Sequence, residues 1–202
     1  MQKRFLAQSM GLFVALSFAG TAQADPMVGV DLQNGQSKTV YGENLLSPIP
    51  DGFKIDRQDR TDRSLMQEMV AQSESVTDWT VMVTTLTVKG QFPVTPDQFS
   101  QNIADGFKRS CPHGDGIKMT EGETNGYAYT QWQMTCDLNP MSHKPEFMVM
   151  RTYQANDAFF NVQYAFRDVP NDGRIKQAID YLNTVQVCDT RIADRPCKLR
   201  SK

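Results

Sequence analysis

The sequence has little of what usually reveals an activity. Its 202 residues include only two histidines, and the hydrolase patterns G-x-S-x-G, S-x-x-K and H-E-x-x-H do not occur. Charges of the two signs nearly balance, with 21 Lys and Arg against 23 Asp and Glu. Nucleic-acid-binding domains usually carry a basic face, so this balance argues against nucleic acid as a partner.

Long hydrophobic runs are also lacking. The apolar stretch GLFVALSFAG at 11–20 is shorter than the roughly 20 residues of a transmembrane helix. It follows Lys3 and Arg4 and precedes an A-x-A pattern that ends at Ala24, an order typical of a cleaved secretory signal. The residue directly after that point is Asp25 and not cysteine, which argues against a lipid anchor. The sequence therefore predicts a signal peptide over 1–24 and a periplasmic or secreted protein without a transmembrane segment.

Four cysteines are present, an even number that favours disulfides in an exported chain. Cys188 and Cys197 bracket a short segment and can close a small loop, which leaves Cys111 to pair with Cys136. By the chain-entropy estimate, each bond contributes on the order of 3 kcal/mol to stability.

Two helices are predicted from their starts. Thr95 can cap the first, Pro96 suits its first position, and Gln98 completes a capping box. The second begins at Asn171-Asp172-Gly173, and apolar residues recur at helical spacing over 175–182.

Strands are predicted between and before these helices. The segments are 39–50, 53–56, 64–72, 79–90, 116–123, 127–136, 146–154 and 158–167. The segment 79–90 is apolar on both faces and should lie inside the sheet. A Pro50-Asp51-Gly52 turn predicts that the strands on either side of it are antiparallel neighbours, and the charged run DRQDRTDR at 56–63 is interpreted as a solvated, self-neutralising turn.

These elements predict one α+β domain over 39–187, in which an antiparallel sheet is covered by two main helices and stapled by disulfides. Residues 25–38 are expected to form a flexible leader, and 188–202 a disulfide-closed C-terminal tail.

The element order resembles the α/β/α sandwich of the PsbP-like superfamily, which includes DcrB-like bacterial periplasmic proteins. The segments that carry the resemblance are NLLSPIPDGFKI at 44–55, SESVTDWTVMVTTLTV at 73–88, TPDQFSQNIADGFKRSC at 95–111 and DGRIKQAIDYLNTV at 172–185. The resemblance implies a non-catalytic binding or assembly protein, and it transfers no site residue.

The stretch CPHGDG, residues 111–116, is the main candidate for chemistry. Cys111 beside His113 is a candidate thiol nucleophile with its base. The alternative is a zinc site of four ligands: Cys111, His113, Cys136 and His143. Against both, Cys111 follows the C-terminal end of a helix, where the dipole disfavours a thiolate, and exported thiols normally form disulfides.

A second candidate metal site is the segment PMSHKPEFMVM. It combines His143 with the thioethers of Met141, Met148 and Met150, and His113 is a further ligand candidate; soft sulfur ligands select Cu(I). Met148 and Met150 share one face of a strand, however, where methionine more often fills a core.

A candidate binding surface is a stripe of tyrosine, glutamine and arginine side chains on two strands, because Tyr and Arg are common interface anchors. Its residues are Tyr127, Tyr129, Gln131, Arg151 and Tyr153. The alternative is that this stripe is the solvated face of the sheet or lies under a helix.

Together these observations predict an exported, non-enzymatic binding or assembly factor of the bacterial cell envelope. The expected partner is another envelope or secreted protein, and no cofactor is expected. The alternatives are a periplasmic copper-binding protein and a secreted hydrolase whose site the sequence does not reveal.

Overall fold

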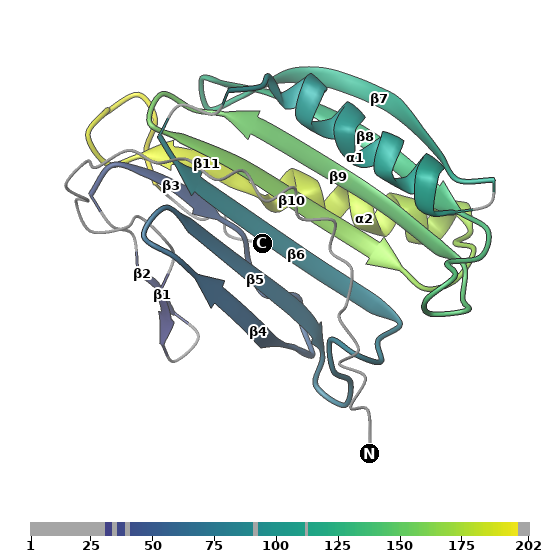
Figure 1. The fold of residues 1–202 in the computed structure, drawn as a ribbon. Helices are drawn as coiled ribbons and strands as arrows, with labels where there is room; N and C mark the ends of the chain where they lie inside the picture. Colours follow the sequence, from purple (N-terminus) through teal and green to yellow (C-terminus); the bar gives the residue numbers. More distant parts are fainter. Residues whose placement is uncertain (1–30, 34–35, 39–40, 91–92, 112, 198–202) are drawn as a thin grey trace, which may run out of the picture.

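The computed structural model describes residues 31–33, 36–38, 41–90, 93–111 and 113–197. Within these residues the chain has an α+β fold, as predicted: a seven-stranded antiparallel sheet with one helix on each face (Figure 1). No helix among them is long and apolar enough to cross a membrane. The predicted signal peptide, 1–24, lies outside the described residues.

The large sheet has the strand order β4-β5-β6-β10-β9-β8-β7. Its strands are β4 (Phe53–Arg60), β5 (Ser64–Ala71), β6 (Val81–Lys89), β7 (Asp115–Thr124), β8 (Tyr127–Cys136), β9 (Glu146–Gln154) and β10 (Ala158–Phe166). β6 pairs with β5 on one side and with β10 on the other, which confirms that the strand apolar on both faces lies inside the sheet.

Helix α1 (Pro96–Ser110) begins with the predicted capping box. The Thr95 hydroxyl accepts from the Gln98 backbone N–H at 3.2 Å, and the Gln98 side chain accepts from the Thr95 N–H at 2.9 Å. The helix packs on β7, β8 and β9, where Ala104 is buried against Trp132 and three methionines of the sheet.

Helix α2 (Asp172–Thr184) covers the opposite face. Its N-cap is Asn171, whose side chain accepts from the backbone N–H of Arg174 at 3.0 Å. Tyr181 and Leu182 are buried in the larger of the core clusters, among the aromatic side chains of β9 and β10. The sheet therefore forms the middle layer between the two helices.

A small second sheet joins the two ends of the domain. β3 (Glu43–Leu46) pairs antiparallel with β11 (Gln186–Asp189), and Leu45 and Val187 add to the core on the α2 side. The prediction that the strands flanking Pro50-Asp51-Gly52 are neighbours is therefore wrong. A tight turn forms there, but it carries the chain from the buried β3 to the exposed edge of the large sheet, where β4 pairs with β5.

The charged run 56–63 is also not simply a turn. Residues 56–60 continue the edge strand β4, and only 61–63 turn into β5. Charged side chains are tolerated there because an edge strand is open to water on one side, and they discourage pairing with another chain. Within the predicted leader, β1 (Asp31–Gln33) and β2 (Gln36–Lys38) form a two-stranded sheet.

The hairpin between β7 and β8 turns at the predicted Asn-Gly pair. Asn125 and Gly126 have φ of 52° and 77°, the left-handed values that a type I′ turn requires at both central positions.

Candidate functional site

The predicted Tyr, Gln and Arg stripe is brought together by the structure, but in the interior. Gln131 and Arg151 are opposite one another on β8 and β9, and Tyr129 is opposite Tyr153. Tyr127, Gln131, Arg151 and Tyr153 are all buried. The stripe is therefore buried: Arg151 reaches the end of α2, as the interpretation of a stripe under a helix expects, whereas Tyr127 lies against Glu43 of β3 and under the guanidinium of Arg195.

Arg151 shows what the stripe does there. Its guanidinium donates twice to Gln131 Oε1, at 3.1 and 2.7 Å, and also to the carbonyl of Leu182 at 3.0 Å and to Asn183 Oδ1 at 2.8 Å. It also stacks on the Tyr129 ring at 4.4 Å. Leu182 and Asn183 lie in the last turn of α2, which contains no basic residue of its own. Arg151 thus supplies a cation from the sheet to the negative end of the α2 dipole.

The predicted cysteine pairs are both formed. Cys111 is bonded to Cys136 and Cys188 to Cys197. Cys111 is the C-cap residue of α1, and its partner lies on β8. A sulfur held in a disulfide is neither a nucleophile nor a thiolate ligand, so the structure provides neither thiol for the catalytic pair or for the zinc site.

The histidines and methionines of the candidate metal sites lie in different surroundings. His113 and His143 are exposed in turns, with φ of 59° and 53°. Met141 is 55% exposed, whereas Met148 and Met150 are buried under α1. Among the described residues no group of three or more His, Cys, Asp or Glu side chains could hold a metal ion.

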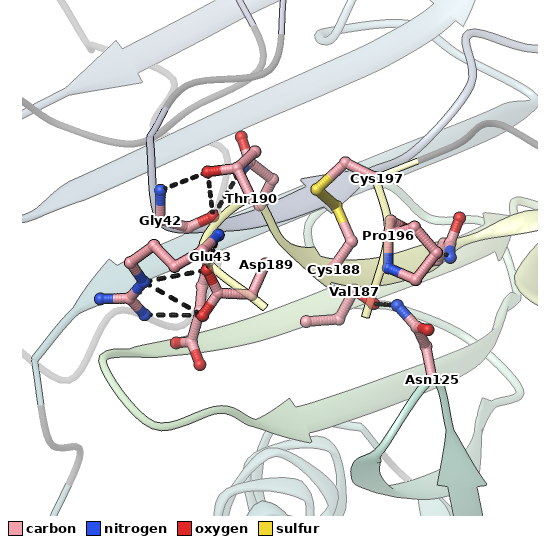
Figure 2. The surroundings of a disulfide bond; sticks show 12 residues. Gly42, Glu43, Asn125, Val187, Cys188, Asp189, Thr190, Pro196 and Cys197 are labelled. Atoms are coloured by element: carbon pink, nitrogen blue, oxygen red, sulfur yellow. Dashed lines mark hydrogen bonds and ion pairs between the residues drawn. A yellow bond between two sulfur atoms is a disulfide. The ribbon is translucent and has the colours of Figure 1, made fainter. Parts of the chain in front are cut away.

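The second disulfide lies beside a set of satisfied polar contacts (Figure 2). Asn125, in the β7–β8 turn, donates to the carbonyl of Val187 at 2.8 Å. Asp189 is fully buried and accepts from the guanidinium of Arg191 at 2.7 and 2.9 Å. The hydrogen bond from Arg191 holds the pKa of Asp189 below its usual value. These contacts stabilise the β3–β11 sheet.

Glu43 is a second buried carboxylate with a full set of partners. One oxygen accepts from the backbone N–H of Asn156 at 2.8 Å and from the hydroxyl of Tyr127 at 3.3 Å. The other accepts from the N–H of Asp157 at 2.7 Å. A carboxylate that accepts backbone N–H groups in this way is accounted for by structure alone.

Glu68 differs from Asp189 and Glu43, because it is buried without a full set of hydrogen-bond partners. It is 8% exposed, and its Oε2 accepts no hydrogen bond from any group in the described residues. The nearest cation is Arg57, with Nη1 at 3.7 Å from that oxygen, while the same guanidinium is 2.7 Å from Asp59. Burial raises the pKa of the Glu68 carboxyl. Carboxylates that are desolvated but incompletely paired are more frequent at functional sites than elsewhere.

The sheet register places Glu68 on the same face as α1. Glu68 lies opposite Thr84 on β6, Thr84 opposite Gln163 on β10, and Gln163 opposite Met150 on β9. Residues directly opposite one another share a face of the sheet, and Met150 packs under α1. Figure 1 shows α1 lying over the β7–β9 side of the sheet, so that within the described part of the chain no helix lies over β5, β6 and much of β10.

This part of the sheet is the candidate functional site, and we call it the open face. It consists of Met66, Glu68, Met82, Thr84, Leu86, Val88 and Gln163. Met82, Thr84, Leu86, Val88 and Gln163 are half-buried, and Met66 is buried like Glu68.

A chain of hydrogen bonds leads from the open face to α1. Gln163 donates to Asn161 Oδ1 at 2.8 Å, and Asn161 donates to the Thr152 hydroxyl at 2.8 Å. Thr152 in turn contacts the hydroxyl of Ser100 on α1 at 3.2 Å. These bonds hold the side chains at the centre of the sheet in fixed positions.

Glu68 is not among the site residues predicted from the sequence, although its strand carries a signal for it. In β5, SLMQEMVA, alternation puts Met66, Glu68 and Val70 on one face, so the glutamate stands between two apolar side chains. An acidic residue at such a position is unexpected in a strand that is buried over most of its length.

Comparison with known proteins gives little to add to this geometry. No protein-family model matches the sequence, and no curated protein matches it. Among solved structures the chain is similar to LpqN of Mycobacterium tuberculosis, described as involved in cell envelope biogenesis. The match has a TM-score of 0.39 and 12% identity, and it covers 79% of this chain and 88% of that chain. We draw no argument from a likeness at this level, and the resemblance to the PsbP-like superfamily stays a prediction.

Proposed function

We propose that this protein is exported and acts without catalysis, as a binding or assembly factor of the bacterial cell envelope, with the open face as its binding surface. The observation that carries the proposal is Glu68, a desolvated carboxylate with an unpaired oxygen on a part of the sheet that α1 does not cover. A surface ready for a partner is where such a group is expected, because the partner can supply the missing hydrogen bond.

The composition of the open face also favours a macromolecular partner. Met82, Leu86 and Val88 are apolar and half-buried, and they lie beside the polar Thr84 and Gln163. Mixed apolar and polar surfaces of this kind are typical of protein interfaces. The proposal of export is supported by the N-terminal signal pattern and by the two disulfides, which persist in oxidising compartments.

The test is photo-crosslinking in the periplasm of a Gram-negative host. A photoreactive amino acid replaces Leu86 on the open face, or Gln177, which is exposed on α2, as the control. We expect a protein adduct from position 86 and none from position 177. The adduct should disappear when Thr84→Arg is added, because the long side chain occupies the surface. Adducts that are equal at both positions, or absent from position 86, would refute the open face as the binding surface.

Export is measured on the same strains. The purified protein should have the mass of a chain that begins at residue 25, with four thiols blocked until reduction. A chain that retains residues 1–24 in the cytoplasm would contradict the proposal.

A further inference from the structure

We infer that the partner presents a Lys or Arg side chain to Glu68, on an extended segment with apolar residues two positions to either side of it. This inference rests on the proposed function and adds the chemistry of the ligand.

Among the described charged groups around Glu68, its own carboxylate is the one without a close ion-pair partner. On the adjoining strand β4, Lys54 pairs with Asp56 at 3.0 Å, and Arg57 is closer to Asp59 than to Glu68. Two cations therefore face three carboxylates. Burial is the main cause of the raised pKa of Glu68; the charge of Arg57 opposes it, and Asp59 and Asp56 add smaller rises. Among the described residues, this group of charges has one cation fewer than it has carboxylates.

The position of the carboxylate selects the kind of cation. Glu68 lies between Met66 and Val70 on its own strand, with Thr84 opposite. A compact hydrated ion would have to lose its water there without gaining several oxygen ligands. A Lys or Arg side chain instead carries an apolar stem that packs against such neighbours while its head meets the carboxylate.

The rest of the open face sets the flanking residues. Leu86 and Val88 alternate with β-strand spacing on the same face as Thr84. An extended segment with apolar side chains two positions before and after the basic residue would match this spacing, because those side chains share its face. The residues between the predicted cleavage site and Lys38, DPMVGVDLQNGQS at 25–37, contain no Lys or Arg. Residues 25–37 therefore do not supply the cation, and we place it on a second protein.

The experiment uses the full mature protein and two synthetic peptides, acetyl-Gly-Val-Thr-Lys-Thr-Val-Gly amide, in which both Val side chains share the face of Lys, and the same peptide with Glu in place of Lys, each with a fluorophore. Binding is followed by fluorescence anisotropy. We expect saturable binding of the Lys peptide, no binding of the Glu peptide, and at least a tenfold weaker Kd for Glu68→Gln. The matched control, Glu123→Gln, makes the same charge change at an exposed position on β7 and should leave Kd within twofold of wild type.

Two further measurements separate a loss of binding from a loss of folding. Thermal unfolding tests whether Glu68→Gln is folded. Thr84→Arg places a cation of the chain's own beside Glu68, so it should also abolish peptide binding. Equal binding of the two peptides, no binding of either, or an unchanged Kd for Glu68→Gln would overturn the inference. If the free protein forms a dimer and Thr84→Arg abolishes that dimer, the occupant of the open face is a second copy of the chain, and the inference is overturned.

Different results would contradict the basic side chain of the partner and the open face as a binding surface. If the crosslink from position 86 persists in Glu68→Gln, the open face binds a partner but not through a basic side chain. If no crosslink forms at position 86, the binding surface itself is wrong.

Discussion

Replacing Arg151 with methionine tests whether the buried stripe stabilises α2. Methionine keeps an apolar chain of similar length and removes the guanidinium. Gln131 Oε1 loses both of its donors, whereas the carbonyl of Leu182 still accepts from Val185 and Asn183 is exposed to water. One buried acceptor is therefore left unsatisfied.

The magnitude follows from these contacts. The unsatisfied acceptor costs about 1–3 kcal/mol, the cation at a partly buried helix end contributes about 1 kcal/mol, and the stacking on Tyr129 contributes about 1 kcal/mol. Releasing the guanidinium from its buried site offsets part of this sum. We therefore expect Arg151→Met to lower the free energy of unfolding by about 2–4 kcal/mol.

Urea unfolding of the oxidised protein, followed by far-UV circular dichroism, measures this change. The m-value should stay constant, so that the midpoint reports the stability change directly. The control is Arg60→Met, an exposed arginine on β4, for which we expect a change within about 0.5 kcal/mol. A loss below about 1 kcal/mol for Arg151→Met, or an equal loss in the control, would refute the account of Arg151 as a cap for α2.

Three further predictions concern local features. Thr95→Ala removes the N-cap acceptor of α1 and should cost about 1 kcal/mol in urea unfolding, and no loss would contradict the role of the capping box. Removing the Cys188–Cys197 bond by double substitution with serine should cost about 2.5–3 kcal/mol for a loop of this length, and a loss larger than that from opening the longer Cys111–Cys136 loop would contradict the chain-entropy reasoning. Glu68→Gln should gain stability relative to wild type as pH rises from 4 to 7. A gap that is constant across this range would show that the pKa of Glu68 is not raised by folding.

The sign of the last prediction follows from proton binding. Burial raises the pKa of Glu68 above its ordinary value of 4.5 in the folded state. Between the ordinary and the raised value the folded protein binds more protons than the unfolded chain, so the wild type loses stability as pH rises through this window. Glutamine does not titrate and lacks this loss.

Local signals in the sequence predicted much of the fold. The helix starts at Thr95 and Asn171 are correct because capping depends on residues a few positions apart. The Asn125-Gly126 turn is correct for the same reason, since its left-handed φ values suit those two residues.

Features that depend on distant parts of the chain were not predicted. The pairing of β3 with β11 joins residues about 140 positions apart, and nothing near either strand identifies its partner. The burial of Arg151 is similar, because it depends on where the end of α2 lies. Whether a helix covers the open face depends on where α1 packs on the sheet. Tertiary packing sets this position, and strand alternation does not.

The pairing of β3 with β11 also has a consequence for the order of folding. A contact between β3 and β11 closes almost the whole α+β domain into one loop, and contacts of high sequence separation are slow to form. The α2 face is therefore completed only when the C-terminal strand is available. A chain shortened before Gln186 lacks that closing strand and cannot complete the α2 face. Completion of the α2 face therefore depends on the last residues of the domain, those of β11.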